Sequence, residues 1–209
     1  SIAAVTTATY LNLSASTRAG AMARLESDLR TAATVSGGKM PGAEVVWAED
    51  GGIEAIKTWA MPRLFVNHDL VDSVQRLTGE SVTIYGAEDA TKPLTALTST
   101  LATAEDQRLI GQILEPTDPA YADLSAGKSY FGETTVAGTA YYTAYQPIQD
   151  QDGALIGALY VGTDKARLEA GILSTLWVLA GVGAVSLAIL GIVGYVLSRV
   201  MMAAVPKLA

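Results

Sequence analysis

The sequence contains no cysteine and a single histidine, His68. Without cysteine the chain has no disulfide framework and no thiol chemistry. A lone histidine excludes a multi-histidine metal site and a pair of histidines acting as acid and base. A nucleophile elbow, a phosphate-binding loop and a dinucleotide-binding glycine motif are also missing. We therefore predict no catalytic residues, no metal site and no cofactor, and we do not expect an enzyme.

Basic residues are outnumbered before the C-terminal part of the chain. The first 169 residues hold all 21 Asp and Glu but only 12 of the 14 Lys and Arg, which gives them a net charge of −9. An acidic surface of this kind argues against nucleic acid, and against an anionic membrane surface, as the partner. It does not exclude a small anionic ligand, because one local arginine can outweigh a distant net charge.

Charge is absent from one long segment, residues 170–198, which lies between Glu169 and Arg199. As a helix, these 29 residues would be roughly 43 Å long, more than the ~30 Å hydrocarbon core of a bilayer. We predict one transmembrane helix over residues 169–199, with Trp177 and Tyr195 at its two interfaces. Alanines recur every four residues at Ala180, Ala184 and Ala188, and they indicate contact with a second helix in a homodimer.

Two helices are predicted in the first half of the chain. Residues 1–35 contain no proline and place apolar side chains such as Leu25 and Leu29 on one face, and the glycines after Ser36 should end this helix. Its apolar start indicates the end of an earlier membrane span. A short helix follows at residues 69–77, with Asp69 as N-cap, Leu77 on the buried face and Gly79 as C-terminal stop. Residues 44–66 stay ambiguous between strand and loop.

After Gly79 the apolar pattern changes to a period of two. Five strands are predicted, at residues 81–85, 94–101, 131–136, 139–148 and 154–162. The last two form a hairpin, and Gly153 supplies the positive φ of its loop. Residues 105–127 should form short helical or irregular segments. The predicted fold class is α+β: a long N-terminal helix packed on a five-stranded antiparallel sheet, followed by one transmembrane helix.

The strand at 139–148 carries the candidate binding site. Alternation places Tyr141, Thr143 and Tyr145 on one face, and Tyr160 on the next strand can join them. Phenol groups donate hydrogen bonds while their rings exclude water, so this face suits a small polar ligand. The alternative is a hydrated outer face of the sheet. Arg108 is the candidate anion clamp, because its guanidinium fork matches a carboxylate; the alternative is an ordinary surface arginine.

Several motifs, in order, resemble a known family. They are Leu70-Val71-Asp72, Leu77-Thr78-Gly79, Val82-Thr83-Ile84-Tyr85, Arg108-Leu109-Ile110-Gly111, Tyr130-Phe131-Gly132, Val136-Ala137-Gly138, Tyr142-Thr143-Ala144-Tyr145-Gln146-Pro147-Ile148, Asp152-Gly153, Ile156-Gly157 and Tyr160-Val161-Gly162. Together with the predicted membrane helix, they resemble the single Cache sensor domains of bacterial chemoreceptors, of the Cache 3/Cache 2 fusion type. The resemblance covers residues 67–164.

This resemblance implies a PAS-like sensor domain over residues 36–168, in the periplasm and anchored in the inner membrane as a homodimer. Residues 200–209 would begin a HAMP linker. The ligand would be a small molecule, with Arg108 binding its carboxylate as in related carboxylate-sensing domains. Those sensors also carry basic residues on the strand where this chain has Thr143 and Tyr145. A small monocarboxylate or a neutral polar ligand is therefore expected rather than a di- or tricarboxylate.

Two other readings stay open. The same sensor can drive a histidine kinase or a diguanylate cyclase instead of a chemotaxis pathway. Alternatively, the chain is a membrane-tethered scaffold whose acidic surface binds a protein and whose pocket takes no small ligand. An exported enzyme ranks third. Ligand binding should separate the sensor from the scaffold.

Overall fold

The computed structural model describes residues 2–40, 42–63, 65–87, 93–103 and 105–168, and, near the C-terminus, residues 185–186, 189–195, 197 and 199. The chain divides into two compact units, Ser1–Lys165 and Ala166–Ala209. The first unit contains a mixed α+β fold, and the candidate site lies entirely within it. Each unit is described separately below.

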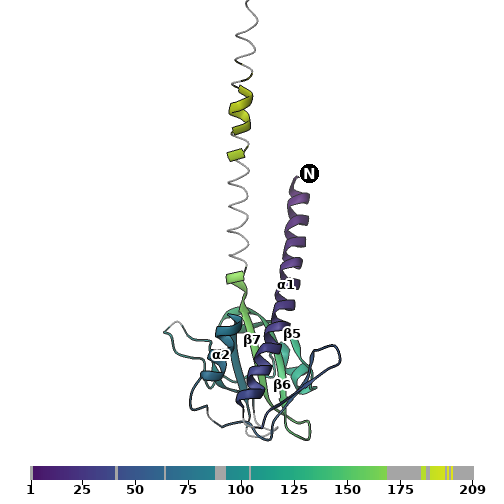
Figure 1. Cartoon of the computed structure of the whole chain (residues 1–209), viewed down its shortest axis with the longest axis vertical. Helices are drawn as coiled ribbons and strands as arrows, with labels where there is room; N and C mark the ends of the chain where they lie inside the picture. The colour runs from purple at the N-terminus through teal and green to yellow at the C-terminus, as the bar shows by residue number, and fades with distance from the viewer. Residues whose placement is uncertain are drawn as a thin grey trace, which may run out of the picture. The chain divides into compact units, whose positions relative to one another are not determined.

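Helix α1 spans Ile2–Lys39, and its first part extends beyond the sheet (Figure 1). The predicted apolar face is confirmed, because Leu25 and Leu29 are buried. The predicted end before Ser36 is wrong, since the helix continues for four residues past position 35. Ser36 is fully buried, and Gly37 lies so close to Val45 that a β-carbon would contact its methyl group. Packing of this turn against the sheet outweighs the cost of about 1 kcal/mol for a helical glycine.

One sheet of seven strands forms the centre of this unit. The strands are β1 Glu44–Trp47, β2 Ile53–Lys57, β3 Ser81–Gly86, β4 Thr95–Ser99, β5 Tyr130–Val136, β6 Thr139–Gln149 and β7 Leu155–Asp164. Their order is β1-β2-β6-β7-β3-β4, and β5 also pairs with β6. The five predicted strands are confirmed as β3 to β7, and they pair antiparallel throughout.

The prediction that the sheet has only five strands is wrong. Residues 44–57, which had no clear pattern, form the hairpin β1–β2. Strand β2 runs parallel to the last residues of β6, with Ile56 opposite Ile148, whereas β5 pairs with β6 only as far as Tyr145. The hairpin therefore occupies the part of β6 that β5 leaves unpaired, and both isoleucines are fully buried there.

Helices cover one face of the sheet, and an irregular segment covers the other. Helix α1 packs on β6 and β7, and α2, Asp69–Thr78, packs on α1 and β3 (Figure 1). The opposite face contacts α3, Pro119–Ser125, which belongs to the segment between β4 and β5. Residues on β6 therefore alternate between the α1 side, as for Tyr142, and the α3 side, as for Tyr145.

Helix α2 differs from its prediction at two positions. Gly79 is confirmed as the stop, since it has a φ of 79° and its N–H donates to the carbonyl of Gln75. Asp69 is not the N-cap. The N-cap is His68, one residue earlier, whose side chain makes no capping hydrogen bond, and the side-chain oxygen of Asn67 accepts from the Asp69 N–H at 3.3 Å. Leu77 is 67% exposed, because only Leu70, Val71 and Val74 point into the core.

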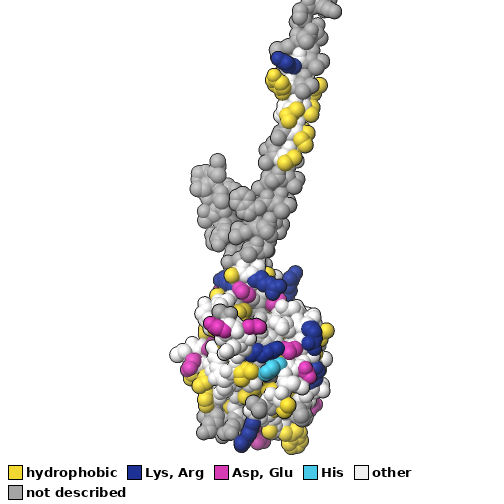
Figure 2. Space-filling view, turned by 90° about the vertical axis from the view of Figure 1, so that its left-hand side faces the viewer, with side chains coloured by type: hydrophobic (Ala, Val, Ile, Leu, Met, Phe, Trp, Pro, Cys, Tyr) yellow, Lys and Arg dark blue, Asp and Glu magenta, His cyan; other side chains and the backbone are white. Residues whose placement is uncertain are grey.

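In the second unit, residues 189–195 are helical. Their large apolar side chains, such as Leu190 and Ile192, are more than half exposed, and Figure 2 shows hydrophobic side chains along this segment. No helix among the residues described here is long and apolar enough to cross a bilayer. Most of the predicted span at 169–199, including Trp177, Ala180, Ala184 and Ala188, lies outside the described residues. The predicted linker at 200–209 also lies outside them.

Candidate ligand cavity on the tyrosine face

Four tyrosines from four strands meet on the α3 side of the sheet. Tyr145 of β6 lies opposite Tyr160 of β7 and Tyr130 of β5, and Tyr85 of β3 completes the group, called here the tyrosine cluster. The ring centroid of Tyr145 lies 4.9 Å from that of Tyr160, 6.2 Å from that of Tyr130 and 6.3 Å from that of Tyr85. These separations fall in the range of favourable edge-to-face contacts. Tyr145 is therefore the centre of the cluster.

The cluster is covered and is not a hydrated outer face. Tyr145 and Tyr160 have no exposed surface. Apolar side chains from the residue before β4, the segment after β4 and α3 form one buried core cluster with them, and these are Leu94, Leu101, Leu114, Ala120 and Leu124. The alternative of an outer face in contact with water is therefore excluded for the central part of this surface.

Two hydroxyl groups in the cluster are buried without a well-formed hydrogen bond. Within the part of the chain that the structure describes, the Oη atom of Tyr160 has no partner, and that of Tyr145 has only the Thr134 hydroxyl near enough to act on its pKa as a hydrogen-bonding group. Burial raises the pKa of both phenols well above the ordinary value, so both remain protonated. A buried polar group without a partner costs about 1–3 kcal/mol. A ligand that forms a hydrogen bond with such a group would remove this cost.

A cavity of about 400 Å³ opens beside Tyr145. It lies between the strands β5 and β6 and the segment that precedes α3. Its lining residues are Tyr85, Gln112, Ile113, Leu114, Glu115, Thr117, Asp118, Pro119, Glu133, Thr134, Thr135, Val136, Ala140 and Tyr145. This volume is within the usual range for small-molecule sites, about 300–1,000 Å³.

Asp118 is the half-buried acidic group of this cavity. It is the N-cap of α3, where its Oδ1 accepts from the N–H of Ala120 at 2.8 Å. Burial raises the pKa of its carboxyl group, and the hydrogen bond from Ala120 only partly offsets this shift. Sequence reasoning missed this residue. The signal was present, since aspartate directly before Pro119 is the usual pattern at the start of a helix.

Of the four sheet residues predicted to bind ligand, only Tyr145 lines the cavity. Tyr160 lies directly behind it in the core. Thr143 is fully buried beneath β5, where its hydroxyl faces the Gly132 carbonyl at 3.5 Å. Tyr141 is half-buried on the same face, nearer the start of β6. The structure confirms that these residues share one face, and their contact with a ligand stays a prediction.

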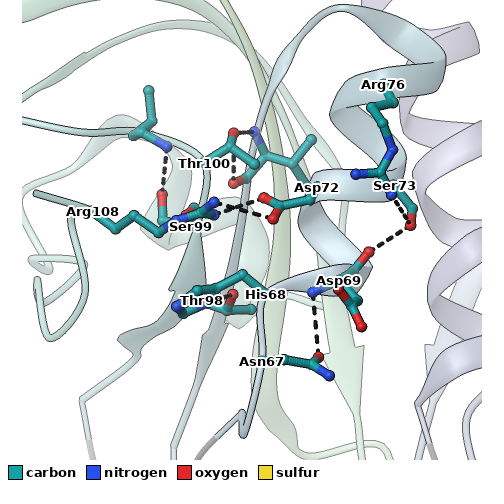
Figure 3. Close-up of polar contacts among 12 residues, drawn as sticks. Asn67, His68, Asp69, Asp72, Ser73, Arg76, Thr98, Ser99, Thr100 and Arg108 are labelled. Carbon is teal, nitrogen blue, oxygen red and sulfur yellow. Dashed lines mark hydrogen bonds and ion pairs between the residues drawn. The ribbon is translucent and has the colours of Figure 1, made fainter. Parts of the chain in front are cut away.

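Arg108 lies at a different place. Its guanidinium binds both oxygens of Asp72 on α2, at 2.7 and 3.1 Å, and it also donates to the Ser99 carbonyl at 2.8 Å (Figure 3). It is not one of the residues lining the cavity. The guanidinium does hold a carboxylate, but that carboxylate comes from a residue 36 positions away in the same chain. Its predicted role as the ligand clamp stays untested.

His68 lies beside this ion pair (Figure 3). Its Nδ1 is 2.8 Å from the hydroxyl of Thr98, which ties the start of α2 to β4. With Arg108 and Asp72, it forms part of the polar contacts that hold α2 against the sheet.

The geometry defines a class of protein: an α+β domain with a long helix on one face of an antiparallel sheet and a ligand-sized cavity on the other. The sequence specifies the family. Residues 59–176, more than half of the chain, match the Cache 3/Cache 2 fusion domain. The chain therefore belongs to the Cache 3/Cache 2 fusion family, as its motifs predicted, and the chemoreceptor type stays a prediction. The comparison with curated proteins gave no match.

Solved structures with a similar fold are sensor domains of signalling proteins. The E. coli DcuS sensor domain is 16% identical over 50% of this chain and 71% of its own, with a TM-score of 0.35. The sensor domain of the V. cholerae histidine kinase DctB is 17% identical over 50% of this chain and 38% of its own, with a TM-score of 0.37. The periplasmic sensory domain of the Campylobacter jejuni chemoreceptor Tlp1 is 12% identical over 79% of this chain and 60% of its own, with a TM-score of 0.39. The chain thus spans less than two thirds of the latter two.

Proposed function

We propose that this chain is the extracytoplasmic sensing part of a transmembrane receptor, of the chemoreceptor type, and that a small polar molecule binds beside Tyr145. The observation that carries the proposal is the buried Tyr145 hydroxyl, which makes no well-formed hydrogen bond in the described chain and belongs to a residue that lines a ligand-sized cavity. A bound molecule would supply the missing hydrogen bond. The stabilisation this provides would favour the liganded conformation.

The sheet connects the cavity with α1 and with the residues that follow β7. On β6, Tyr145 faces the cavity while its neighbour Ala144 faces α1. On β7, Tyr160 lies on the same side of the sheet as Tyr145, and Val161 lies on the α1 side. A change in the position of Tyr145 therefore acts on strands that α1 also contacts. Strand β7 ends at Asp164, and residues 165–168 are already helical. Signalling requires that the ligand bind the two receptor states with different affinity.

The sequence supports a membrane location for the C-terminal unit. The uncharged segment at residues 170–198 is longer than a bilayer requires, and the helical residues 189–195 expose large apolar side chains. We place the sensing domain in the periplasm and the anchor in the inner membrane, as a homodimer. Chemical cross-linking in membranes should trap a dimer. A strictly monomeric product would contradict this part of the proposal.

A ligand screen tests the sensing function directly. The full chain in a nonionic detergent is screened by thermal shift against organic acids, amino acids, amines, polyols and purines. A ligand at 100 times its dissociation constant adds about 2.7 kcal/mol, which corresponds to roughly 5–10 °C. Tyr145→Phe should weaken a genuine hit, whereas Tyr142→Phe, on the opposite face of the same strand, should not. Failure of every compound would favour a scaffold that binds a protein through its acidic surface.

A further inference from the structure

Every charged residue that lines the cavity is acidic. Among its fourteen lining residues are Glu115, Asp118 and Glu133, and none of the fourteen is a lysine, arginine or histidine. A small anion entering this space would meet like charges without a counter-ion in the lining. A small cation would meet opposite charges.

Glu133 is already paired outside the cavity. Its Oε2 accepts from the Lys165 ammonium at 2.8 Å, and its Oε1 lies 3.9 Å from the Nε of Arg18 on α1. Tyr130 also donates to the backbone carbonyl of Glu133. The negative charge available to a ligand therefore comes from Asp118 and the exposed Glu115.

Asp118 is close enough to act on the whole tyrosine cluster. Its negative charge raises the pKa of Tyr85, Tyr130, Tyr145 and Tyr160, in each case after the larger effect of burial. The hydrogen bond from Ala120 uses one of its oxygens, and a carboxylate offers about four acceptor positions. The half-buried carboxylate thus keeps the capacity to accept from a bound ammonium group.

Tyr145 provides an independent sign of a ligand. Its side chain is completely buried, its hydroxyl makes no well-formed hydrogen bond in the described chain although the Thr134 hydroxyl lies nearby, and it lines the same cavity as Asp118. The phenol oxygen can accept from an ammonium N–H. The faces of tyrosine rings also attract cations within about 6 Å. An ammonium group placed between the two residues would satisfy both of them.

We infer that this cavity selects a small organic cation, a protonated amine or a quaternary ammonium, with Asp118 as its counter-ion and Tyr145 as its second contact. This inference rests on the proposed sensing function and specifies its ligand class. It differs from the carboxylate expected from Arg108, whose guanidinium is occupied by Asp72 outside the cavity. A metal ion fits less well, because the described residues contain no cluster of three or more acidic or histidine side chains able to hold one.

Probes matched in shape but not in charge test the inference. Choline is compared with its neutral isostere 3,3-dimethylbutan-1-ol and with the anion 3,3-dimethylbutanoate. Butylammonium is compared in the same way with butyramide and butyrate. Binding to the full chain in nonionic detergent is followed by ¹⁹F NMR with 3-fluorotyrosine, and the resonance of Tyr145 is assigned by its loss in Tyr145→Phe. We expect at least one of the two cations to shift this resonance and to bind at least tenfold more tightly than its neutral and anionic partners.

Asp118→Asn is the decisive variant, because asparagine keeps the capping oxygen for the Ala120 N–H and removes only the charge. It should reduce the cation preference to less than threefold without lowering the melting temperature. The matched control is Asp150→Asn. Asp150 also accepts backbone N–H groups, from Asp152 and Ala154, but in a hairpin outside the cavity lining. This control should bind cations as the unmodified chain does.

Other outcomes separate the inference from the function it rests on. Equal or tighter binding of a neutral or anionic probe, still sensitive to Tyr145→Phe, would overturn the cation preference and leave the sensor intact. Failure of both cations to bind would also overturn it, and the wider metabolite screen would then decide whether the cavity binds anything. A preference that survives Asp118→Asn would remove Asp118 from the site.

Discussion

Arg108 and Asp72 form a two-pronged ion pair that joins the segment after β4 to the first turn of α2 (Figure 3). Both side chains are about one third exposed, so solvent weakens the attraction without removing it. The Arg108 guanidinium also donates to the Ser99 carbonyl at the end of β4. One side chain thus connects three parts of the domain.

Arg108→Ala is expected to lower the stability of the domain by about 1–2 kcal/mol, since it removes the ion pair and the hydrogen bond to Ser99. The melting temperature should fall by roughly 2–8 °C. The control Arg76→Ala removes an exposed arginine of α2 that contacts only Ser73 and should change little. A double-mutant cycle with Asp72→Ala should show coupling. Loss of ligand binding at unchanged stability would instead restore Arg108 as a ligand clamp.

Tyr145→Phe should move stability and binding in opposite directions. The variant removes a buried hydroxyl that makes no well-formed hydrogen bond, so the free domain should be as stable as the original or slightly more stable. The same hydroxyl is the proposed ligand contact, so affinity should fall by about tenfold. Tyr160→Phe removes a hydroxyl of the same kind that does not line the cavity. Equal loss of affinity in both variants would mean that the cluster acts only through packing.

Gly162→Ala should destabilise the domain. A β-carbon at this position on β7 would overlap the ring of Tyr160, whose side chain is fully buried and has no free space to move. Overpacking of this kind costs about 1–3 kcal/mol. The control Gly38→Ala places a methyl group where no atom lies within 4 Å, in the last turn of α1. It should stabilise the helix by about 0.5–1 kcal/mol, and chemical denaturation of both variants measures the difference.

Cation binding should depend on pH through Asp118. Its pKa is raised in the folded domain, mainly by burial, so the carboxylate forms at a higher pH than in an unperturbed aspartate. Affinity for a cation should therefore rise with pH through this pKa and level off above it. The phenols that face Asp118 stay neutral over this range, because their pKa values are raised as well; they are Tyr85, Tyr130, Tyr145 and Tyr160.

The remaining acids around the site make Asp118→Asn essential as a control. Glu115 and Glu133 line the cavity, and Asp123 acts on Tyr130. If Asp118 governs binding, its asparagine variant should show a flat pH profile. The stability of the free domain should show the opposite trend. A raised folded-state pKa favours the protonated form, so the contribution of Asp118 to stability is greatest at low pH and is lost as the pH rises. A persistent pH dependence of binding in the variant would assign it to the other acids.

The parts of the fold with a strong local pattern could be predicted from the sequence. Alternation gave the five strands β3 to β7, and Gly79 marked the end of α2, because each of these signals acts over a few residues. The hairpin β1–β2 could not be predicted, since its strands are short and its partner β6 lies about 90 residues away in the sequence. Packing also decides the outcome at Gly37, where contact with Val45 of β1 overrides the local tendency of glycine to end a helix.

The candidate site was predictable only in part, for a related reason. The residue type of Arg108 indicated a carboxylate partner, but nothing in the sequence shows that Asp72 would be that partner. The tyrosine face followed from alternation on β6. Which of its tyrosines reaches the cavity depends on the irregular segment between β4 and β5, which has no regular pattern. Asp118 belongs to that segment, and its local signal indicates a helix start rather than a binding site.

The sheet also constrains how the domain folds. Its central strands, β6 and β7, are the last two to be synthesised, and they pair with β3, β5 and β2. Helix α1, at the start of the chain, packs on the same two strands. The β1–β2 hairpin lacks its partner in the sheet until β6 is complete at residue 149, and α1 lacks part of its packing surface until β7 is complete at residue 164. Folding therefore depends on contacts between residues far apart in the sequence, which makes it slow relative to helical proteins of the same size. A nascent chain that lacks β7 would expose the tyrosine cluster and the apolar face of α1, so the domain should fold as one unit, after synthesis of the whole sheet.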